Sequence, residues 1–305
     1  MKSKNSILLL TFPAGGPFHW AQNLQKELIK NGYETTLAAG KKEYLKQQFK
    51  YYDIVHSCVP MFNPFCKKFI LTIHGNFKAE KHLSRFLFPI AIKRAHFITI
   101  PSEFLRNELH LDKALIIPNG IYPPQKIKKD YFLKNHQPTF GILTNFNFKP
   151  KADGLFNLAK IIQQTYPAGK LIIGGDGLFL KEYQKRLLQI HPNIEFIGHC
   201  KKEDLFEKID IFTYYSFLDN QPLALLEAMA YGLPVISNSV GAIAEMLTGE
   251  LSVSLTKNDE IFKKTLQKLT ESQSLRATFG NNARQKTFKY HWDQTTTKFL
   301  ALYEK

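Results

Sequence analysis

Short apolar runs alternate with amphipathic stretches along almost all of this 305-residue chain. Residues 7–12 and 69–74 are almost wholly apolar, whereas residues 18–31 mix apolar and polar side chains as a surface helix does. Continuous apolar runs are typical of strands buried on both faces, and parallel strands need a helical crossover between them. The alternation therefore predicts parallel sheets covered by helices, an α/β fold.

The pattern occurs twice. The first half has strands expected at residues 7–12, 35–39, 54–56, 69–74, 97–101 and 115–118. Its helices are expected at 18–31, ended by Gly32, and at 83–95, interrupted by Pro89. The prolines Pro123 and Pro124 and the Lys-rich run 126–129 look like an interdomain linker.

The second half repeats the order, with strands expected at residues 139–143, 170–173, 194–197, 209–213, 235–237 and 252–255. Helices are expected near 154–165, 180–190 and 202–208, around Glu227, and twice more before the last residue. A chain of this length suits two domains of about 150 residues each.

Composition excludes several classes of protein. The hydrophobic content of 44% and charged content of 22% are those of a soluble globular protein. No apolar run approaches the ~20 residues of a membrane span, and residues 7–10 are too short for a signal sequence. The three cysteines, Cys58, Cys66 and Cys200, show no metal spacing and are odd in number, so we expect a reducing cytoplasm. No nucleic-acid-binding signature occurs, and nucleic acid is not expected as a partner.

The net charge of +15 is unevenly distributed. Residues 1–129 hold 20 Lys and Arg residues but only 8 Asp and Glu residues. Two cation-rich stretches contain apolar side chains: Lys41, Lys42, Lys46 and Lys50 around Tyr44, Leu45 and Phe49; and Lys78, Lys81, Arg85, Lys93 and Arg94 around Leu83, Phe86, Leu87 and Phe88. Such stretches suit an anionic membrane surface. The alternative is that the apolar residues pack inward and the lysines are merely solvated.

The segment from Asp219 to Glu227 carries the clearest chemical signal. Pro222 suits a first helical turn and Asn220 a helix cap, which places Asp219 on a loop and Glu227 on the helix that follows. A helix N-terminus favours a phosphate, and nearby carboxylates accept hydrogen bonds from ribose or hexose hydroxyls. The alternative is that both acids only complement the helix dipole.

The flanks of this segment resemble a known family. Ile209-Asp210-Ile211-Phe212 precedes it, and Tyr231-Gly232-Leu233-Pro234-Val235-Ile236-Ser237, Gly241 and Glu245 follow it. This order is similar to that of the retaining glycosyltransferases of family 4, which have the GT-B fold. In them a first acid contacts the donor sugar and a second, eight residues later, holds the ribose. The resemblance thus assigns the sugar to Asp219, where Glu is usual, and the ribose to Glu227.

The resemblance also implies the architecture: two Rossmann-like doubly wound domains that face each other across a cleft. Residues 1–125 would form the N-terminal acceptor domain and residues 126–288 the nucleotide-sugar donor domain. Residues 289–305, with Trp292 and Tyr303, would form a helix that crosses back to the N-terminal domain.

In the N-terminal domain, Gly15 and Gly16 follow the first strand without forming a dinucleotide-binding fingerprint. They are either a tight turn or, as the resemblance implies, the neighbours of the donor phosphates. His74 ends a strand and is either structural or, by resemblance, faces the donor sugar. Ser102 is expected to cap a helix.

In the C-terminal domain, family members carry an Arg and a Lys that clamp the diphosphate. This chain has no Arg there, and Asn145 or Asn147 stands near its place. Lys149 or Lys151 would supply the cation, with Lys151 favoured because it lies closer to Gly154. The resemblance assigns Gly175, His199, Asn220 and Leu223 to donor binding as well.

These patterns predict a retaining, metal-independent glycosyltransferase without a cofactor. It would move a hexose from a nucleotide-sugar to a glycan or lipid-linked acceptor, in cell-surface polysaccharide or lipopolysaccharide synthesis. Its expected place is the cytoplasm, including the inner face of the membrane. The alternatives are a non-catalytic nucleotide-sugar-binding relative and a nucleotide-sugar epimerase of the same fold.

Overall fold

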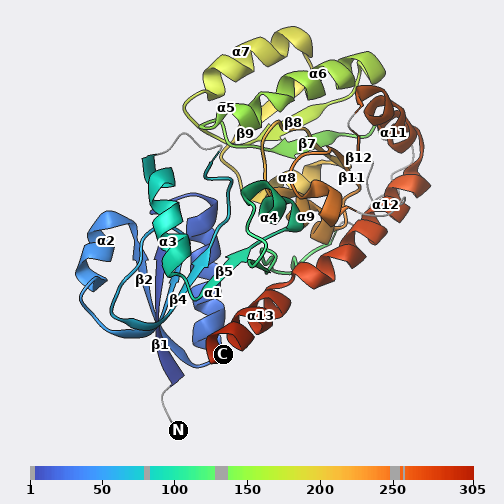
Figure 1. Ribbon diagram of the computed structural model, residues 1–305. Coiled ribbons are helices and arrows are strands. Elements are labelled where there is room, and N and C mark those ends of the chain that lie inside the picture. Colours follow the sequence, from blue (N-terminus) through green and yellow to red (C-terminus); the bar gives the residue numbers. More distant parts are fainter. Residues whose placement is uncertain (1–3, 79–82, 128–136, 248–254, 257) are drawn as a thin grey trace. The chain divides into compact units, whose positions relative to one another are not determined.

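The computed structural model describes residues 4–78, 83–127, 137–247, 255–256 and 258–305 (Figure 1). The chain divides into two compact units. The first unit comprises Met1–Tyr122 together with Tyr290–Lys305, and the second comprises Pro123–Lys289. The C-terminal segment therefore returns to the unit in which the chain begins.

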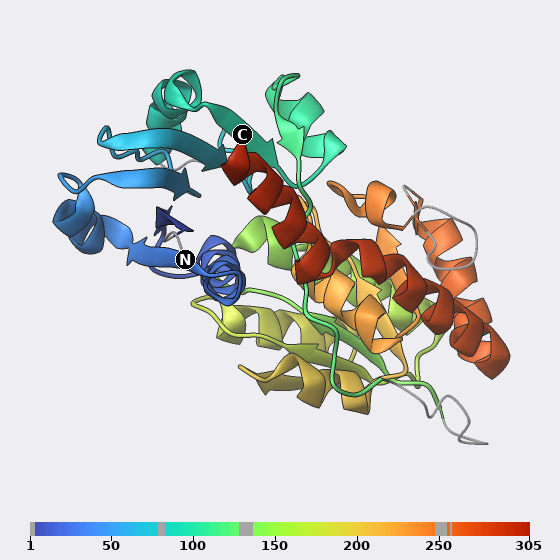
Figure 2. The ribbon, with the colours of Figure 1, turned by 90° about the horizontal axis from the view of Figure 1, so that it is seen from below.

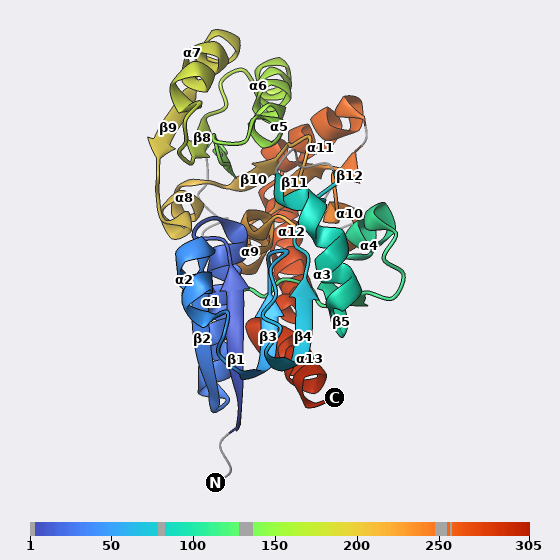
Figure 3. The same cartoon turned by 60° about the vertical axis from the view of Figure 1, so that its left-hand side comes forward.

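The first unit contains a parallel sheet of strands β1 (Lys4–Thr11), β2 (Tyr33–Ala39), β3 (Tyr52–Ser57), β4 (Cys66–Thr72), β5 (Phe97–Ile100) and β6 (Leu115–Ile116). Their order is β2-β1-β3-β4-β5-β6, as Figure 3 shows for its first four strands. The strand order changes direction at β1, because β2 lies on one side of it and β3 on the other. The point between β1 and β3 is where a doubly wound sheet binds its ligands.

The helices of the first unit are α1 (Gly16–Lys30), α2 (Gly40–Gln47), α3 (Phe88–Arg94), α4 (Glu103–Leu109) and α13 (Trp292–Glu304), with a 3₁₀-helix at Leu83–Leu87. Side chains alternate along β1, since the repeat of a strand is two residues. Ile7 and Leu9 join the core formed with α1 and α13, and Leu8 and Leu10 join the core formed with α3 and α4. Each face of the sheet therefore has its own helical layer.

The last helix, α13, is a full member of the first unit, and Figure 2 shows it in red beside this sheet. Trp292 and Phe299 are buried in the core shared with α1. Gly120 makes room for the indole, because a Cβ atom there would lie 2.5 Å from the Trp292 ring. His56 Nδ1, on β3, forms a hydrogen bond of 2.6 Å with the Tyr303 hydroxyl.

The second unit contains a parallel sheet of strands β7 (Phe140–Leu143), β8 (Leu171–Gly174), β9 (Ile194–Gly198), β10 (Ile211–Tyr214), β11 (Val235–Asn238) and β12 (Leu255–Thr256). Their order is β12-β11-β10-β7-β8-β9. Strands β8 and β9 follow β7 on one side of it, whereas β10, the next strand in the chain, pairs with β7 on its other side. The second switch point therefore lies between β7 and β10.

The helices of the second unit are α5 (Lys149–Ala152), α6 (Gly154–Thr165), α7 (Leu180–Ile190), α8 (Lys202–Lys208), α9 (Leu223–Tyr231), α10 (Ile243–Met246), α11 (Asp259–Glu271) and α12 (Gln273–Lys286). A 3₁₀-helix, Thr287–Tyr290, follows α12. Among the described residues, no helix combines the length and the apolar character that crossing a membrane requires.

The predicted fold class is confirmed: both sheets are parallel and alternate with helices. Several local predictions were wrong. Three α-helices follow β12 instead of two, and α2, α5 and α10 were not expected. The stretch 83–95 is divided as predicted, but one residue before Pro89: the 3₁₀-helix ends at Leu87 and α3 begins at Phe88. Pro89 lies in the first turn of α3, where an N–H would have no intrahelical partner. Of the strand expected at 252–255, residues 252–254 lie outside the described residues, as do residues 128 and 129 of the expected linker.

Candidate active site

The predicted donor-site residues of the second unit gather at one edge of its sheet. Asn145, Gly175, His199 and Asp219 follow the carboxyl ends of β7, β8, β9 and β10. All these strands are parallel, so their carboxyl ends meet at one edge. Asn145 and Asp219 flank the switch point between β7 and β10, which is the expected ligand position in such a sheet.

Close backbone packing brings α5 and α6 against the loop that follows β10. Gly154 begins α6, and a Cβ atom at this position would overlap the carbonyl oxygen of Tyr215. The Phe217 N–H donates to the Pro150 carbonyl oxygen at 3.2 Å. Glycine at 154 therefore permits an approach that sets Lys151 beside Asp219.

Lys151 and Asp219 form an ion pair, with Lys151 Nζ 2.5 Å from Asp219 Oδ2. The Asp219 side chain is 11% exposed and that of Lys151 30% exposed. The Tyr214 hydroxyl donates to the same carboxylate oxygen, while Oδ1 accepts the Asn220 N–H at 2.9 Å. Burial, and then the charge of Asp219, raises the pKa of Tyr214 well above its ordinary value, so its phenol stays a neutral donor. Oδ1 retains capacity to accept a further hydrogen bond.

The loop after β11 fixes the backbone on which Asp219 sits. Gly241 has a φ of +58°, in the left-handed region that favours glycine, and a Cβ atom there would overlap the Asp219 carbonyl oxygen. The Ala242 N–H donates to the Asn220 carbonyl oxygen at 2.7 Å. Both contacts hold the Asp219–Asn220 peptide in place.

Asp219 lies on a loop and Glu227 on α9, as predicted. The predicted cap was wrong. Pro222 is the N-cap residue, with extended backbone and no side-chain hydrogen bond, and Leu223 is the first helical residue. Asn220 is not the cap because it lies two residues before Pro222, the N-cap position from which a side chain reaches the first free N–H groups of a helix.

Glu227 pairs with Lys202, a residue that the sequence did not single out. Lys202 Nζ lies 2.6 Å from Glu227 Oε1, and the side chains are 37% and 23% exposed. Burial raises the pKa of Glu227, whereas Lys202 acts in the opposite direction. Lys202 begins α8, and no local pattern indicates that this helix start faces α9.

Lys149 points to a different neighbour from Lys151, although both lie on α5. Lys149 Nζ lies 3.5 Å from a carboxylate oxygen of Glu182 on α7 and 4.4 Å from the ring centre of Phe179. Within the described part of the chain, only Lys151 of these two lysines contacts a predicted site residue. The structure therefore brings Lys151 and Asp219 together and leaves Lys149 apart.

The glycine-containing loop after β8 packs against the loop after β7. Gly175 has a φ of +138°, and a Cβ atom there would overlap the Thr144 carbonyl oxygen. Its N–H donates to the Gly198 carbonyl oxygen at 2.8 Å, beside the exposed His199. Asn145 is exposed and accepts the Asn147 N–H at 2.8 Å. Close packing accounts for glycine at position 175 without a ligand.

Gly15, Gly16 and His74 lie in the first unit. Gly15 is the N-cap of α1 with a φ of +86°, and nothing lies within 4 Å of a Cβ atom built at Gly15 or Gly16. This opening follows β1, the strand at the first switch point. His74 follows β4; its ring centre lies 4.6 Å from that of Trp20, and its Nε2 is buried with no hydrogen-bond partner among the described residues. Burial lowers the pKa of His74 to about 4, so the imidazole is neutral at pH 7.

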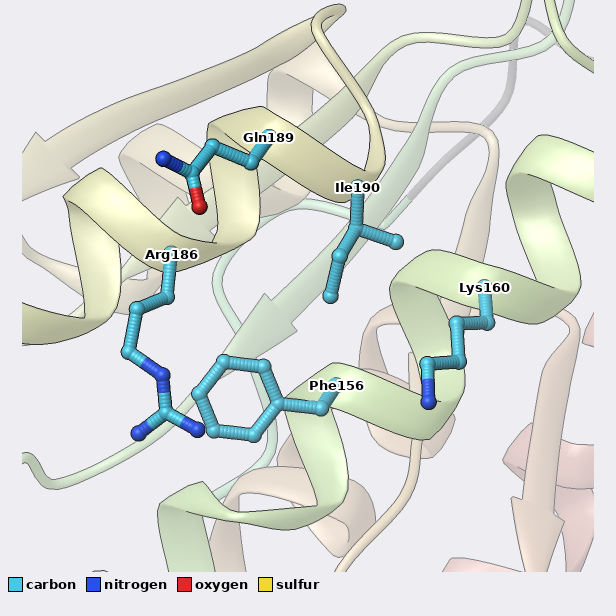
Figure 4. Close-up of a pocket in the computed structure, with 5 residues that line it drawn as sticks. All are labelled: Phe156, Lys160, Arg186, Gln189 and Ile190. Carbon is cyan, nitrogen blue, oxygen red and sulfur yellow. The ribbon is translucent and has the colours of Figure 1, made fainter.

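A groove lies between α6 and α7 (Figure 4). Phe156 and Lys160 line it from α6, and Arg186, Gln189 and Ile190 line it from α7. The Arg186 guanidinium lies 4.2 Å from the Phe156 ring centre. No predicted site residue lines this groove, which is therefore separate from the sheet edge that holds the acids.

Comparison with known proteins agrees with this arrangement. The sequence profile of the family described as "Glycosyl transferases group 1" matches residues 124–286. The uncharacterized glycosyltransferase MJ1178 of Methanocaldococcus jannaschii is 24% identical over 250 residues, covering 77% of this chain and 68% of that protein. The sulfoquinovosyl transferase SQD2 of Arabidopsis thaliana is 30% identical over 151 residues. That match covers 46% of this chain and only 29% of the plant protein.

Solved structures share the fold over nearly the whole chain. Sucrose-phosphate synthase from Thermosynechococcus elongatus superposes with a TM-score of 0.83, at 16% identity, over 99% of this chain and 98% of that one. Anabaena Alr3699/HepE in complex with UDP superposes with a TM-score of 0.78, at 13% identity, over 98% and 99% of the two chains. At these identities the superpositions establish the two-domain fold, and the profile match over residues 124–286 establishes the family. The chain belongs to the group 1 glycosyl transferases.

Proposed function

We propose that this protein is a retaining glycosyltransferase that moves a hexose from a nucleotide-sugar to an acceptor hydroxyl. The observation that carries the proposal is the pair of carboxylates at the carboxyl edge of the second sheet. Asp219 holds the Lys151 cation at 2.5 Å, and Glu227 lies on α9, the helix that begins after the same loop. A cation and a helix N-terminus suit a diphosphate, and the two acids suit sugar hydroxyls.

Each group has a proposed part in the reaction. Lys151 and the start of α9, with Leu223 as its first residue, stabilise the diphosphate as its charge grows. Asp219 Oδ1 accepts a hydrogen bond from a hydroxyl of the donor sugar, and Glu227 accepts hydrogen bonds from the ribose hydroxyls. The bond between the anomeric carbon and the diphosphate oxygen breaks while the acceptor oxygen bonds that carbon on the same face. The acceptor proton passes to the leaving diphosphate. The protein thus supplies positioning and charge stabilisation.

The proposal also gives roles to three predicted residues of the first unit. Gly15 and Gly16 would admit the donor phosphates at the open carboxyl end of β1, and His74 would bond a sugar hydroxyl through its neutral ring. Structures of Anabaena Alr3699/HepE hold UDP and UDP-glucose, which makes a uridine nucleotide-sugar the first donor to test.

The acceptor is proposed to be a glycan or a lipid-linked glycan in cell-surface polysaccharide or lipopolysaccharide synthesis. One relative, from Campylobacter jejuni, is an N-acetylgalactosaminyltransferase whose name includes a diphosphate-undecaprenol glycan. Another, from Salmonella typhi, is a Vi polysaccharide biosynthesis protein. They are 25% and 28% identical to this chain over 150 and 144 residues.

A cation-rich surface of the first unit supports docking on an anionic membrane. We define the α2 patch as the exposed residues Leu45, Phe49, Tyr51 and Phe65 together with Lys41, Lys42, Lys46 and Lys50. Phe49 is 77% exposed and its ring centre lies 6.4 Å from that of Phe65. Exposed aromatic rings among lysines suit a layer of anionic headgroups.

Two residues of the cation-rich stretches do not belong to any such surface. Tyr44 packs against the core, and Phe88 is buried and stacks on Phe77 with ring centres 4.4 Å apart. Phe86, Leu87 and Ile90 remain exposed near α3. The prediction for Lys81 falls outside the described residues, and so does that for the Leu83 side chain.

A panel of nucleotide-sugars tests the proposed activity. A true donor should raise the melting temperature of the protein, since a ligand at 100 times its dissociation constant adds ~2.7 kcal/mol of stability. Slow release of free nucleotide would indicate an enzyme. Thermal stabilisation without any release of nucleotide would favour a non-catalytic binding protein. This alternative is supported by the contacts of Asp219 Oδ2, which already interacts with the Tyr214 hydroxyl and the Lys151 ammonium. No stabilisation by any nucleotide-sugar would refute the proposal.

A further inference from the structure

We propose that Lys202 is a positioning residue for the donor: its ammonium holds one oxygen of Glu227 so that the other accepts a ribose hydroxyl. The inference rests on the proposed function, because it concerns how the same site recognises a nucleotide. Neither the family profile nor the resemblance in the sequence assigns a part to this lysine.

The two carboxylate oxygens of Glu227 differ in their hydrogen bonds. Lys202 Nζ lies 2.6 Å from Oε1, a short charge-assisted hydrogen bond. Oε2 has no hydrogen-bond partner among the described residues. A carboxylate held at one oxygen cannot rotate freely, so the second oxygen is presented in a fixed direction. A preorganised acceptor of this kind loses little entropy when a hydroxyl binds.

The contact between α8 and α9 keeps Lys202 in place. Leu205 and Phe206 of α8 are buried, and the Phe206 ring centre lies 5.5 Å from that of Tyr231 on α9. Phe206 also contacts Phe212 of β10 edge to face. An aromatic cluster therefore holds the second half of α8 against the end of α9, and this packing fixes the helix whose first residue is Lys202.

The surroundings of Glu227 leave Lys202 as its counter-charge. Burial raises the pKa of Glu227 and the nearby Glu203 raises it further, whereas Lys202 lowers it. The elements packed on α9 carry these other charged or titratable groups: Asp204, Glu207 and Lys208 of α8, Tyr214 of β10, which is hydrogen-bonded to Asp219, and Arg276, Arg284 and Lys286 of α12. Of the charged groups that the structure describes, only Lys202 and Glu203 act on the pKa of Glu227. Arg276 bonds the carbonyl oxygens of Leu269 and Thr270. Without Lys202, Glu227 would take up a proton at a higher pH and become a poorer acceptor.

Adjacent lysines allow a matched test. Lys202→Met removes the cation but keeps much of the stem, and Lys201→Met removes the neighbouring, exposed cation. The dissociation constant for UDP is measured by calorimetry from pH 5.5 to 8.5 for both variants and the unmodified protein. We expect Lys202→Met to weaken UDP binding about tenfold at pH 6, which corresponds to a loss of about 1.4 kcal/mol of binding free energy. The loss should shrink as the pH rises and Glu227 ionises, while Lys201→Met should follow the unmodified protein.

A double-mutant cycle separates this role from a direct phosphate contact. In a Glu227→Gln background, Lys202→Met should cause no further loss of UDP affinity, because the group that it serves is gone. A loss that is independent of pH and persists in that background would overturn the inference, as would a Lys202→Met protein that matches the unmodified one. Lys202→Arg keeps the positive charge and should bind UDP as the unmodified protein does. Its result shows whether the loss in Lys202→Met comes from the missing cation or from misfolding. Failure of the unmodified protein to bind UDP or any other nucleotide would instead refute the proposed function itself.

Discussion

Lys151 of α5 and Asp219 of the loop after β10 form an ion pair across the switch point of the second sheet, with 2.5 Å between Nζ and Oδ2. The two residues follow strands β7 and β10, which are neighbours in the sheet although β8 and β9 separate them in the chain. In this structure the proposed phosphate cation and the proposed sugar acid therefore neutralise each other. A bound diphosphate would compete with Asp219 for Lys151. Asp219 Oδ2 would then be able to accept a hydrogen bond from a hydroxyl of the sugar.

Replacing Lys151 should slow the reaction much more than replacing Lys149. Lys151→Ala is expected to lower kcat by about 100-fold, in the range found when one group that stabilises transition-state charge is removed. Lys149→Ala should have little effect because Lys149 pairs with Glu182. Initial rates of nucleotide release from saturating nucleotide-sugar measure both. Small and equal effects would mean that neither lysine clamps the diphosphate.

Asp219→Asn should reduce turnover more than donor binding. The amide keeps the size of the side chain but removes the negative charge, and the sugar contact matters most as the glycosidic bond breaks. Steady-state kinetics with the donor varied separates kcat from KM. A raised KM with unchanged kcat would exclude Asp219 as a contact of the reacting sugar.

Glu227→Ala should weaken nucleotide-sugar binding and activity together, by roughly 2–4 kcal/mol, because a site built for a ribose hydroxyl loses its acceptor. Calorimetry with the nucleotide-sugar measures the loss. Glu260→Ala on α11 is the control, since this carboxylate is exposed and pairs with Lys263 on its own helix. Normal binding by a folded Glu227→Ala protein would contradict the ribose assignment.

The first unit should lose stability as the pH falls from about 6.5. Burial lowers the pKa of His56 to about 3 and that of His74 to about 4, from 6.5 for an unfolded histidine. The unfolded chain thus binds protons that the folded unit does not. Each histidine lowers the free energy of unfolding by up to about 1.4 kcal/mol per pH unit in that window.

Urea unfolding followed by tryptophan fluorescence measures this dependence on pH. Both tryptophans, Trp20 and Trp292, lie in the first unit, so the signal reports on that unit alone. His74→Gln should reduce the slope between pH 6 and pH 5 by about half, because one of two titrating imidazoles is gone. An unchanged slope would show that His74 is protonated in the folded protein.

The protein should sediment with anionic vesicles and not with neutral ones. Binding should fade as salt is added, because screening shortens the reach of the charges. Changing Lys41, Lys42, Lys46 and Lys50 to Gln should weaken it by about 1 kcal/mol per lysine. The same change at the exposed lysines Lys160, Lys181, Lys185 and Lys201 of the second unit is the control. Equal binding to both kinds of vesicle would refute docking through the α2 patch.

The sequence by itself was sufficient for the fold class, because hydrophobic periodicity is a local property of the chain. It placed the strands that flank both switch points, and it placed Asp219 on a loop and Glu227 on a helix. Ser102 was also correctly expected as a cap: its hydroxyl accepts the Leu105 N–H. Short helices were missed, since four residues such as those of α5 give no measurable periodicity.

Side-chain partners were decided only by the tertiary structure. Lys151 meets Asp219 because β10 returns to lie beside β7 and because Gly154 lets α6 touch the loop after β10. Lys202 meets Glu227 because an aromatic cluster seats α8 against α9. The sequence determined which residue types follow which strands. Which cation faces which acid depends on strand order and close packing between distant segments, and no local pattern of residues encodes either.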